Sequence, residues 1–315
     1  MLKGCKINKK KKYHKLLLIL LGLVSIILVA WITIVYLTYG KSGTATVINL
    51  SDLKIPQKDF LTLLSINMAH GRSDGKSQLL QRNDNIKRNV ESIGELIKRE
   101  RADLVALQEA DAPSWWSGDI SHVEMAAKIS DMSHAVQAFN VNGLGLHYGT
   151  AILSNLQILD AEQVTFPMSF PTFSKGFTVA ECQWPSSSML FDFISIHLDF
   201  ASPKVRQRQL KQLKNFIQQR NKPVIIAGDF NTNLKSEALL QFMKELELSV
   251  WQPENKEIIT FPKLNKRIDW IFVSQNFKIH THQVLDDVIS DHRAIKITIS
   301  QTNEADFSKY QYNLD

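Results

Sequence analysis

The sequence contains few of the residues that form covalent cross-links or flexible repeats. Only Cys5 and Cys182 occur among its 315 residues, which excludes a disulfide framework and a cysteine-rich zinc site. Glycine and proline number 13 and 9, and no internal repeat or low-complexity block is present apart from the N-terminal lysines. The composition is therefore that of an ordinary globular protein, long enough for one large domain or two average ones.

Acidic residues are absent from residues 1–15, which contain seven lysines. The formal net charge of the chain is +6, so removing these seven positive charges leaves the rest of the chain at −1. A near-neutral domain gains little from the phosphate electrostatics that dominate non-specific binding to DNA. Nucleic acid is consequently a possible but not a favoured partner, and the sequence identifies no protein partner.

Charged residues are also absent from residues 16–39, a stretch long enough to cross a bilayer as a helix. Trp31, Tyr36 and Tyr39 lie towards its far end, as is typical of a membrane interface. The lysines before it favour a cytoplasmic N-terminus, with the rest of the chain outside the cytoplasm. The alternatives are a buried helix of a soluble protein and a cleaved signal peptide, although no clear A-x-A site follows Tyr39. We expect a single-pass anchor in the cell membrane.

The segments of the chain and its hydrophobic periodicity indicate an α/β fold. The segments are a basic cytoplasmic tail (1–15), a transmembrane helix (16–39), a linker (40–58), a folded domain (59–301) and a polar tail (302–315). Strands are expected over 60–66, 104–107, 134–139, 148–153, 156–165, 176–184, 190–197, 224–228, 267–273, 277–285 and 294–299. Helices are expected over 85–101, 120–131, 203–220 and 236–246. These helices cannot all connect parallel strands, which indicates two sheets packed together with helices outside.

A short apolar strand over 224–228 is followed by the polar sequence Asp229-Phe230-Asn231. The strand delivers Asp229 and Asn231 to its carboxyl end, where open α/β sheets commonly bind ligands. A carboxylate and an amide there can hold a hard cation and a water. The alternative is an ordinary turn, because Asp and Asn are common turn formers.

Similar polar side chains stand at the ends of other expected strands. They are Asn67, Glu109, His197, Asp269 and the pair Asp291-His292. Each alone has a simple explanation as a turn or cap residue. Their recurrence at strand ends favours one shared site of carboxylate, amide and imidazole groups.

Taken in order, the motifs at these positions resemble those of the endonuclease/exonuclease/phosphatase superfamily. They are Ser65-Ile66-Asn67, Leu107-Gln108-Glu109, Gly149-Thr150-Ala151-Ile152-Leu153-Ser154, Ile196-His197, Gly228-Asp229-Phe230-Asn231, Arg267-Ile268-Asp269 and Ser290-Asp291-His292. The resemblance implies a four-layered α/β sandwich, with two packed, mainly antiparallel sheets and helices outside. This architecture agrees with the pattern of strands.

The resemblance also implies a divalent cation at the first two motifs. Glu109 would supply a carboxylate to Mg²⁺, with Mn²⁺ as a possible substitute, and Asn67 would hold the metal or orient Glu109. Asp291 would be an additional metal ligand. His70 follows Asn67 closely enough to contact substrate in the cleft; the alternative is a loop histidine bonded to backbone.

The remaining motif residues would act on water and phosphate. By resemblance, Asp229 positions or deprotonates the attacking water, and Asn231 binds a phosphoryl oxygen. His292 contacts the phosphate from the opposite side, and Asp269 fixes the tautomer of His292 and raises its basicity. His197 donates a hydrogen bond to the phosphate. Abasic-site endonucleases of the superfamily have tyrosine at this strand end, so His197 disfavours a DNA-repair enzyme.

Loops would determine which phosphoester is cleaved. Trp115 and Trp116, in the loop after Glu109, are expected to pack under that loop. Insertion into a bilayer interface and stacking on a substrate are the alternatives. The helix over 203–220 should turn its basic side chains to solvent, with contact to anionic lipid as the alternative.

We therefore predict a membrane-anchored, Mg²⁺-dependent phosphoesterase. It would hydrolyse a phosphodiester or phosphomonoester, in a lipid headgroup or a small phosphorylated metabolite, by metal-assisted in-line attack of water. The alternatives are an extracytoplasmic endonuclease or exonuclease of the same fold and a catalytically inactive binding protein. An inactive protein would be expected to lack a metal ligand or an acid, and none of the expected positions is missing.

Overall fold

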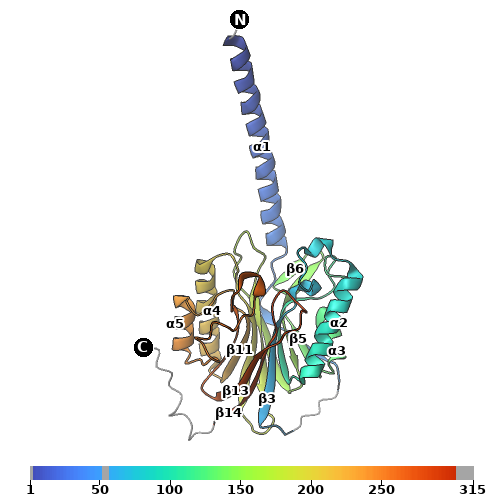
Figure 1. The fold of residues 1–315 in the computed structure, drawn as a ribbon, viewed down its shortest axis with the longest axis vertical. Helices are drawn as coiled ribbons and strands as arrows, with labels where there is room; N and C mark the ends of the chain where they lie inside the picture. The colour runs from blue at the N-terminus through green and yellow to red at the C-terminus, as the bar shows by residue number, and fades with distance from the viewer. Residues whose placement is uncertain (1–2, 52–56, 303–315) are drawn as a thin grey trace.

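The computed structural model describes residues 3–51 and 57–302, with side chains from residue 13 onward. Helix α1 (Lys3–Leu37) projects from a body of two packed sheets with helices on their outer faces (Figure 1). The expected α/β sandwich with a long N-terminal apolar helix is therefore confirmed. Beyond Thr302, the expected polar tail lies outside the described residues.

Six strands form the first sheet, in the order β1-β8-β9-β10-β11-β12. Their bounds are β1 Gly43–Thr44, β8 Ile158–Thr165, β9 Gly176–Gln183, β10 Leu190–His197, β11 Val224–Asp229 and β12 Asp269–Val273. Strands β10 and β11 run parallel, and the other neighbours in this sheet are antiparallel. The parallel register sets His197 beside Asp229.

Seven strands form the second sheet in the order β13-β14-β3-β4-β7-β5-β2, and β6 pairs with β7 beside them. Their bounds are β2 Thr46–Asn49, β3 Phe60–Asn67, β4 Leu104–Asp111, β5 His134–Gln137, β6 Val141–Gly143, β7 Leu146–Ser154, β13 Phe277–Val284 and β14 Ile295–Gln301. Strands β3 and β4 are parallel. The side-chain amide of Asn67 donates to Asp229 Oδ2 over 3.2 Å, so the carboxyl ends of the two parallel pairs meet.

Alternating apolar residues explain the layers, because successive side chains of a strand point to opposite faces. In β3, Leu61 and Leu63 join the core between the sheets, while Leu64 and Ile66 face the outer helices. The helices α2 (Asn83–Glu100) and α3 (His122–Ile129) cover that outer face. On the other side of the sandwich, α4 (Pro203–Arg220) and α5 (Glu237–Glu245) cover the six-stranded sheet (Figure 1).

Three short 3-10 helices complete the described secondary structure. They are η1 (Ala69–Gly71), η2 (Gln78–Leu80) and η3 (Pro262–Leu264). The first two lie between β3 and α2, and the third precedes β12. All three therefore lie in loops at the carboxyl end of β3 or the amino end of β12, close to the strand-end polar residues.

Three expected boundaries differ from the structure. The helix expected over 16–39, after a separate tail, runs from Lys3 to Leu37. The segment 40–58, expected to be a linker, contains β1 and β2, which form edge strands of the two sheets. The strand expected over 104–107 continues to Asp111, with a break in register between Leu107 and Ala110. Glu109 lies in this bulge with φ of 49°. It is therefore part of a distorted strand and does not follow a finished one.

The last turns of α1 pack directly on the folded domain. Val35 and Thr38 are buried, and Tyr39 forms an antiparallel bridge with Val141 of β6. The indole of Trp31 donates to the carbonyl oxygen of Pro171 over 2.9 Å. The apolar span Tyr13–Leu37 has a mean hydropathy of 3.0, and most of its side chains are exposed. Only its C-terminal end packs against the folded domain.

Candidate active site

Asp229 stands at the centre of the polar cluster where the two sheets meet. Its side chain is buried, and its oxygens accept hydrogen bonds from the backbone N–H of Asn231 (2.8 Å) and the side-chain amide of Asn67 (3.2 Å). The preceding Gly228 has φ of 152°, and a Cβ there would lie 2.0 Å from the carbonyl oxygen of Ile196. Glycine is required because it lets β11 approach β10 closely at the point where Asp229 enters the site.

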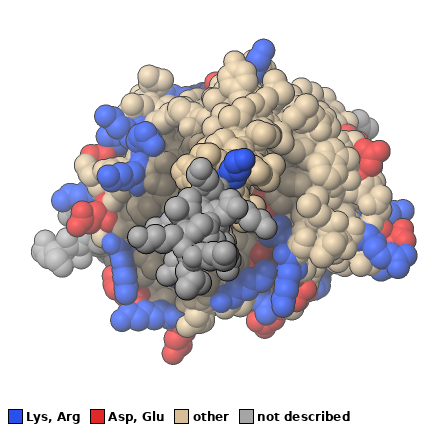
Figure 2. Space-filling view, turned by 90° about the horizontal axis from the view of Figure 1, so that it is seen from above, with Lys and Arg blue, Asp and Glu red and all other residues tan. Residues whose placement is uncertain are grey.

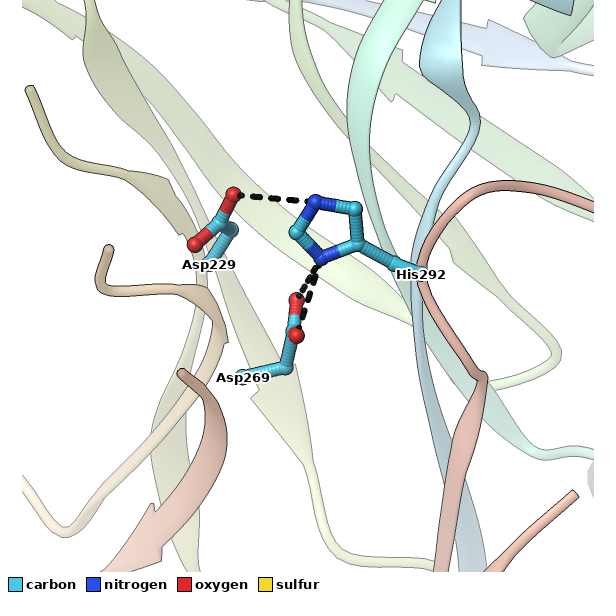
Figure 3. A group of neighbouring side chains, drawn as sticks. All are labelled: Asp229, Asp269 and His292. Carbon is cyan, nitrogen blue, oxygen red and sulfur yellow. Dashed lines mark hydrogen bonds and ion pairs between the residues drawn. The ribbon is translucent and has the colours of Figure 1, made fainter. Parts of the chain in front are cut away.

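His292 lies between two carboxylates (Figure 3). Its Nδ1 is 2.9 and 3.0 Å from the oxygens of Asp269, and its Nε2 is 3.8 Å from Asp229 Oδ2. Burial opposes protonation of the ring, but Asp269 and Asp229 outweigh it and raise the pKa of His292 to about 10. Burial, with Asp269 nearby, raises the pKa of Asp229 to about 7. The histidine is thus an imidazolium at neutral pH, with one N–H turned towards Asp229.

His197 approaches Asp229 from the neighbouring strand. Its Nε2 is 3.5 Å from Asp229 Oδ2, and its Nδ1 is 3.4 Å from the ammonium group of Lys175. Burial and Lys175 hold the pKa of His197 well below its usual value, so the ring is neutral. Because Lys175 can only donate, Nδ1 is the acceptor and Nε2 bears the proton that faces Asp229.

Glu109 is surrounded by basic side chains. Its carboxylate lies 3.4 Å from Arg72, 3.4 Å from His70 and 3.9 Å from Lys175. Burial opposes ionisation, but the electrostatic influence of His70, Lys175 and Arg72 outweighs it and keeps the pKa of Glu109 well below the usual value. Glu109 is therefore a carboxylate at neutral pH, and its contacts are longer than the roughly 2.7–2.9 Å of a strong charge-assisted hydrogen bond.

The donors around Glu109 fit a hard divalent cation. The guanidinium of Arg72 lies between the carboxylates of Glu109 (3.4 Å) and Asp291 (3.1 Å). Both carboxylates therefore point to the same place, which a positive charge already occupies. Mg²⁺ takes one or two carboxylates and keeps several waters, which this pair can supply. Asn67 is committed to other partners, because its Oδ1 accepts from the N–H of Ala69 and its amide donates to Asp229.

A second group of potential ligand atoms belongs to the triad in Figure 3. One atom each from Asp229, Asp269 and His292 lie within 4.8 Å of one another. The ring of His292 is bonded to Asp269 on one side and is protonated. Since a metal-bound histidine must be neutral, this triad is less suited to a cation than the pair of Glu109 and Asp291.

His70 has contacts that the sequence did not predict. Its Nδ1 lies 2.7 Å from Asp111 Oδ1, and the second oxygen of Asp111 accepts from the indole of Trp116 over 2.8 Å. The expected alternative, a loop histidine whose ring bonds backbone, is wrong. The ring instead lies behind Glu109 and can orient its carboxylate; direct contact with substrate stays a prediction.

All the motif residues expected at the site lie in this cluster or border it. They are Asn67, His70, Glu109, His197, Asp229, Asn231, Asp269, Asp291 and His292. The side-chain amide of Asn231 donates to the carbonyl oxygen of Leu198 over 2.9 Å, and its role on phosphate stays a prediction.

Three charged residues of the cluster were missed: Arg72, Lys175 and Asp111. Arg72 directly follows the Asn67-x-x-His70-Gly71 segment, and Asp111 follows Glu109 by two residues, so closeness to the motifs is a signal that could have found them. Lys175 immediately precedes β9 and is indistinguishable in sequence from a turn lysine. Only its contacts with Glu109 and His197 identify it.

The expected packing of the tryptophan pair is correct for one member. Trp116 stacks on Tyr148 and lies 5.0 Å from the ring of His70, measured between centroids. Trp115 is 60% exposed. One tryptophan therefore supports the site, and its neighbour points to solvent at the rim.

Comparisons with known proteins agree with this architecture. A model of the endonuclease/exonuclease/phosphatase family matches residues 64–292. No curated protein matches the sequence. A structure from Bacteroides vulgatus, described as an endonuclease/exonuclease/phosphatase, has a TM-score of 0.62 at 14% identity and covers 78% of this chain and 100% of its own.

Two further structures of similar fold are a phosphatase and a TDP2. A mannosyl-6-phosphatase from Bacteroides thetaiotaomicron has a TM-score of 0.57 at 17% identity, covering 76% of this chain and 99% of its own. A humanized TDP2 of D. rerio has a TM-score of 0.58 at 17% identity, covering 78% of this chain and 100% of its own. At these identities the likeness concerns the fold.

Proposed function

The chain belongs to the endonuclease/exonuclease/phosphatase family of metal-dependent phosphoester hydrolases, and we propose that it is a membrane-anchored, Mg²⁺-dependent member that cleaves a phosphodiester or phosphomonoester. The surroundings of Asp229 support this proposal most. The nearest imidazole nitrogens of His197 and His292 lie 3.5 and 3.8 Å from its Oδ2. Such separations are too long for direct hydrogen bonds and accommodate a bridging water or a phosphoryl oxygen.

Asp229 is the group best suited to accept a proton from the attacking water. A general base works best when its pKa lies near the operating pH, and the pKa of this buried carboxyl is about 7. The hydrogen bonds from Asn231 and Asn67 fix its orientation. Water held against its free lone pairs would be directed between the two imidazoles.

The two histidines can stabilise the charge that develops on the phosphoryl group. His292 holds a proton on Nε2 because Asp269 stabilises the imidazolium, and His197 holds one on Nε2 because Lys175 occupies its Nδ1. Fixed donors that point to where negative charge grows are a large source of rate enhancement. Both N–H groups are set in place before substrate binds.

Glu109 and Asp291 would hold the divalent cation, with Asn67 beside them. The cation would polarise a phosphoryl oxygen and relieve charge on the leaving oxygen. His70 and Asp111 would keep Glu109 oriented, as hydrogen-bonded partners of metal ligands commonly do. Arg72 would move towards the substrate or solvent when the two carboxylates bind metal.

We propose that α1 remains attached as the anchor, with the lysine-rich N-terminus in the cytoplasm. A span of 25 residues with a mean hydropathy of 3.0 is long enough to cross a bilayer. Removing a signal peptide would uncover the surface that Val35 and Thr38 contact. A helix that forms part of the folded domain is better explained as a retained segment.

The test is hydrolysis by the full chain in detergent, with an aryl phosphodiester and an aryl phosphomonoester as soluble substrates. Release of the aryl group should require Mg²⁺ or Mn²⁺ and stop with chelator. Asp229→Ala should abolish it, while Asp160→Ala, at a partly exposed carboxylate remote from the site, should retain it. Absence of cleavage with either metal would contradict the proposal, and efficient, salt-sensitive cleavage of DNA or RNA would favour the nuclease instead.

A further inference from the structure

The exposed large apolar side chains of the folded domain gather at one end of the sandwich. We call this the site end: the end where β3, β4, β10 and β11 finish at the catalytic cluster. Outside α1, the described residues of this kind at the site end are Leu79, Leu80, Trp115, Leu144, Met168, Phe170, Phe200, Leu264 and Val288. The others are Phe60 and Leu159, which stand at the opposite end, at the starts of β3 and β8. A monomeric soluble surface rarely gathers its exposed apolar groups in this way.

Hydrogen bonds tie the segments that contain these apolar side chains to the loops that build the site. Next to Leu79, Gln78 donates to the carbonyl oxygens of His70 and Trp116. Phe200 follows Asp199, whose carboxylate accepts from Ser169 and Thr172 in the loop that contains Met168 and Phe170. The apolar residues therefore form a rim around the site.

The apolar helix leaves the domain at the same end. Residues 38–42 alone separate α1 from β1, and the bonds of Thr38 and Gly40 to Asn142 and Asn140 leave no free spacer between them. Figure 2 looks down on this face, where Lys and Arg stand around much of the margin and a broad area without charged side chains lies towards the upper right. If α1 spans the bilayer, this face must lie at the membrane surface.

A series of aromatic contacts joins α1 to the metal-site carboxylate. The ring of Trp31 lies 5.2 Å from Phe173, and Phe173 lies 6.3 Å from Trp116, between centroids. Trp116 in turn lies 5.0 Å from His70, whose Nε2 is 3.4 Å from Glu109. The membrane helix and the site are thus parts of one packed unit, so the mouth of the site has a fixed direction relative to the helix.

We propose that the apolar rim lies in the interface of the bilayer that α1 crosses, and that the phosphoester substrate is part of a membrane lipid of the adjoining leaflet. The inference rests on the proposed function and specifies its substrate class. Aromatic and aliphatic side chains beside basic groups are typical of surfaces that lie in the lipid interface. A bilayer is the occupant that the geometry favours, because the apolar helix and the rim share one end of the domain. A lipid phosphate would reach Asp229 from the membrane plane.

The first experiment measures where the rim lies, independently of catalysis. The full chain with Cys5→Ser is reconstituted in vesicles of phosphatidylcholine with a minor share of phosphatidylglycerol, leaving the buried Cys182 as the sole native thiol. A fluorophore is attached through Phe200→Cys or, as the matched control, through Phe60→Cys. These phenylalanines are 62% and 53% exposed, at opposite ends of the sandwich. Brominated lipids should quench the label at position 200 and not at position 60; equal, weak quenching at both would overturn the proposal.

The second experiment measures catalysis on these vesicles and on matched vesicles that also contain phosphatidylinositol or sphingomyelin. Release of headgroup or phosphate from phosphatidylglycerol or from one of the added lipids is expected. The double variant Trp115→Asp and Phe200→Asp should lower this rate by about a hundredfold, since burial of each such side chain corresponds to roughly a tenfold change. Phe60→Asp should leave it unchanged.

The two experiments separate the inference from the function on which it rests. If a soluble aryl phosphoester is cleaved and no vesicle lipid is, the lipid substrate class is overturned and the phosphoesterase stands. If the label at position 200 is quenched but no phosphoester of any kind is cleaved, the rim is supported and the proposed function fails. Quenching together with lipid hydrolysis supports both.

Discussion

In the part of the chain that the structure describes, charged side chains cluster both at the end of α4 and at the site, and their contact distances differ. At the end of α4, Arg220 makes two bonds to Asp192, at 2.7 and 2.9 Å, one to Glu162 at 2.6 Å and one to Glu181 at 3.2 Å. At the site, Glu109 and Asp229 have their basic partners at 3.4–3.9 Å. The Arg220 cluster is closed, whereas the site leaves space around Glu109 and Asp229.

The two clusters also differ in the pKa values of their ionisable groups. Arg220 donates hydrogen bonds to Asp192, which raise the pKa of its guanidinium above the already high usual value, so this group stays charged. At the site, the pKa of Asp229 moves to about 7. A closed cluster stabilises the fold, whereas spaced groups with displaced pKa values are typical of sites that bind and react.

The largest expected effect comes from removing the charge of Glu109. Glu109→Gln should lower the turnover of an aryl phosphoester by about a thousandfold, equivalent to about 4 kcal/mol, because the cation loses its main carboxylate. Thermal unfolding in chelator should change little. The matched control is Glu181→Gln in the Arg220 cluster, which should retain activity; a similar loss in both variants would erase the distinction between the clusters.

Breaking the closed cluster should affect stability and not catalysis. Arg220→Met removes the shared partner of buried acids and should lower the free energy of unfolding by about 3 kcal/mol. Chemical denaturation of the full chain in detergent would measure it, with activity expressed per folded molecule. Arg208→Met, at an exposed position of the same helix, should cost little. Unchanged stability in Arg220→Met would show that the cluster does not stabilise the fold.

An intermediate effect is expected at His70, which lies beside Glu109. His70→Ala should lower activity about 10- to 100-fold, the range for partners that orient metal ligands. The loss should appear mainly as a higher Mg²⁺ concentration for half-maximal activity. His147→Ala, which removes a histidine bonded to Asn142 on the neighbouring strand, is the control. A normal Mg²⁺ requirement in His70→Ala would contradict an orienting role.

The smallest expected effect is a pH-dependent gain in stability for Asp229→Asn. The pKa of this carboxyl rises from 3.8 to about 7 on folding, so its contribution to stability is present at low pH and is lost as pH rises through about 7. The variant lacks this loss. In chelator, the gain in stability of the variant over the parent should therefore be about 1 kcal/mol larger at about pH 7 than at about pH 6. A difference independent of pH would contradict a raised pKa.

The regular elements were predictable because their apolar periods are strong. Strand β10 and helix α4 have the bounds expected from sequence, 190–197 and 203–220, and Leu210, Leu213 and Ile217 are buried as their spacing indicates. The basic face of α4 was only partly predicted. Arg220 turns to the acids of the six-stranded sheet and not to solvent, since several carboxylates converge there from other strands.

The site was predictable where its residues stand at strand ends and unpredictable elsewhere. Asp229 and His197 end neighbouring parallel strands, so their meeting follows from the sheet. Lys175 comes from a loop, and Arg72 from the turn after η1. A loop has no hydrophobic periodicity from which the direction of a side chain could be predicted. The short strands β1 and β2 were missed because two and four residues are too few to show an apolar alternation.

The backbone of the site has a consequence for how the protein could be made more robust. His70, Glu109 and Asn231 all have left-handed backbone, with φ of 51°, 49° and 50°. Asparagine tolerates this conformation, whereas for glutamate and histidine it costs roughly 1 kcal/mol or more. Selection for heat resistance alone would therefore favour glycine or asparagine at Glu109, and would discard the cation-binding carboxylate in the process. At Glu109, the substitution that would raise thermal stability is therefore one that would lower activity.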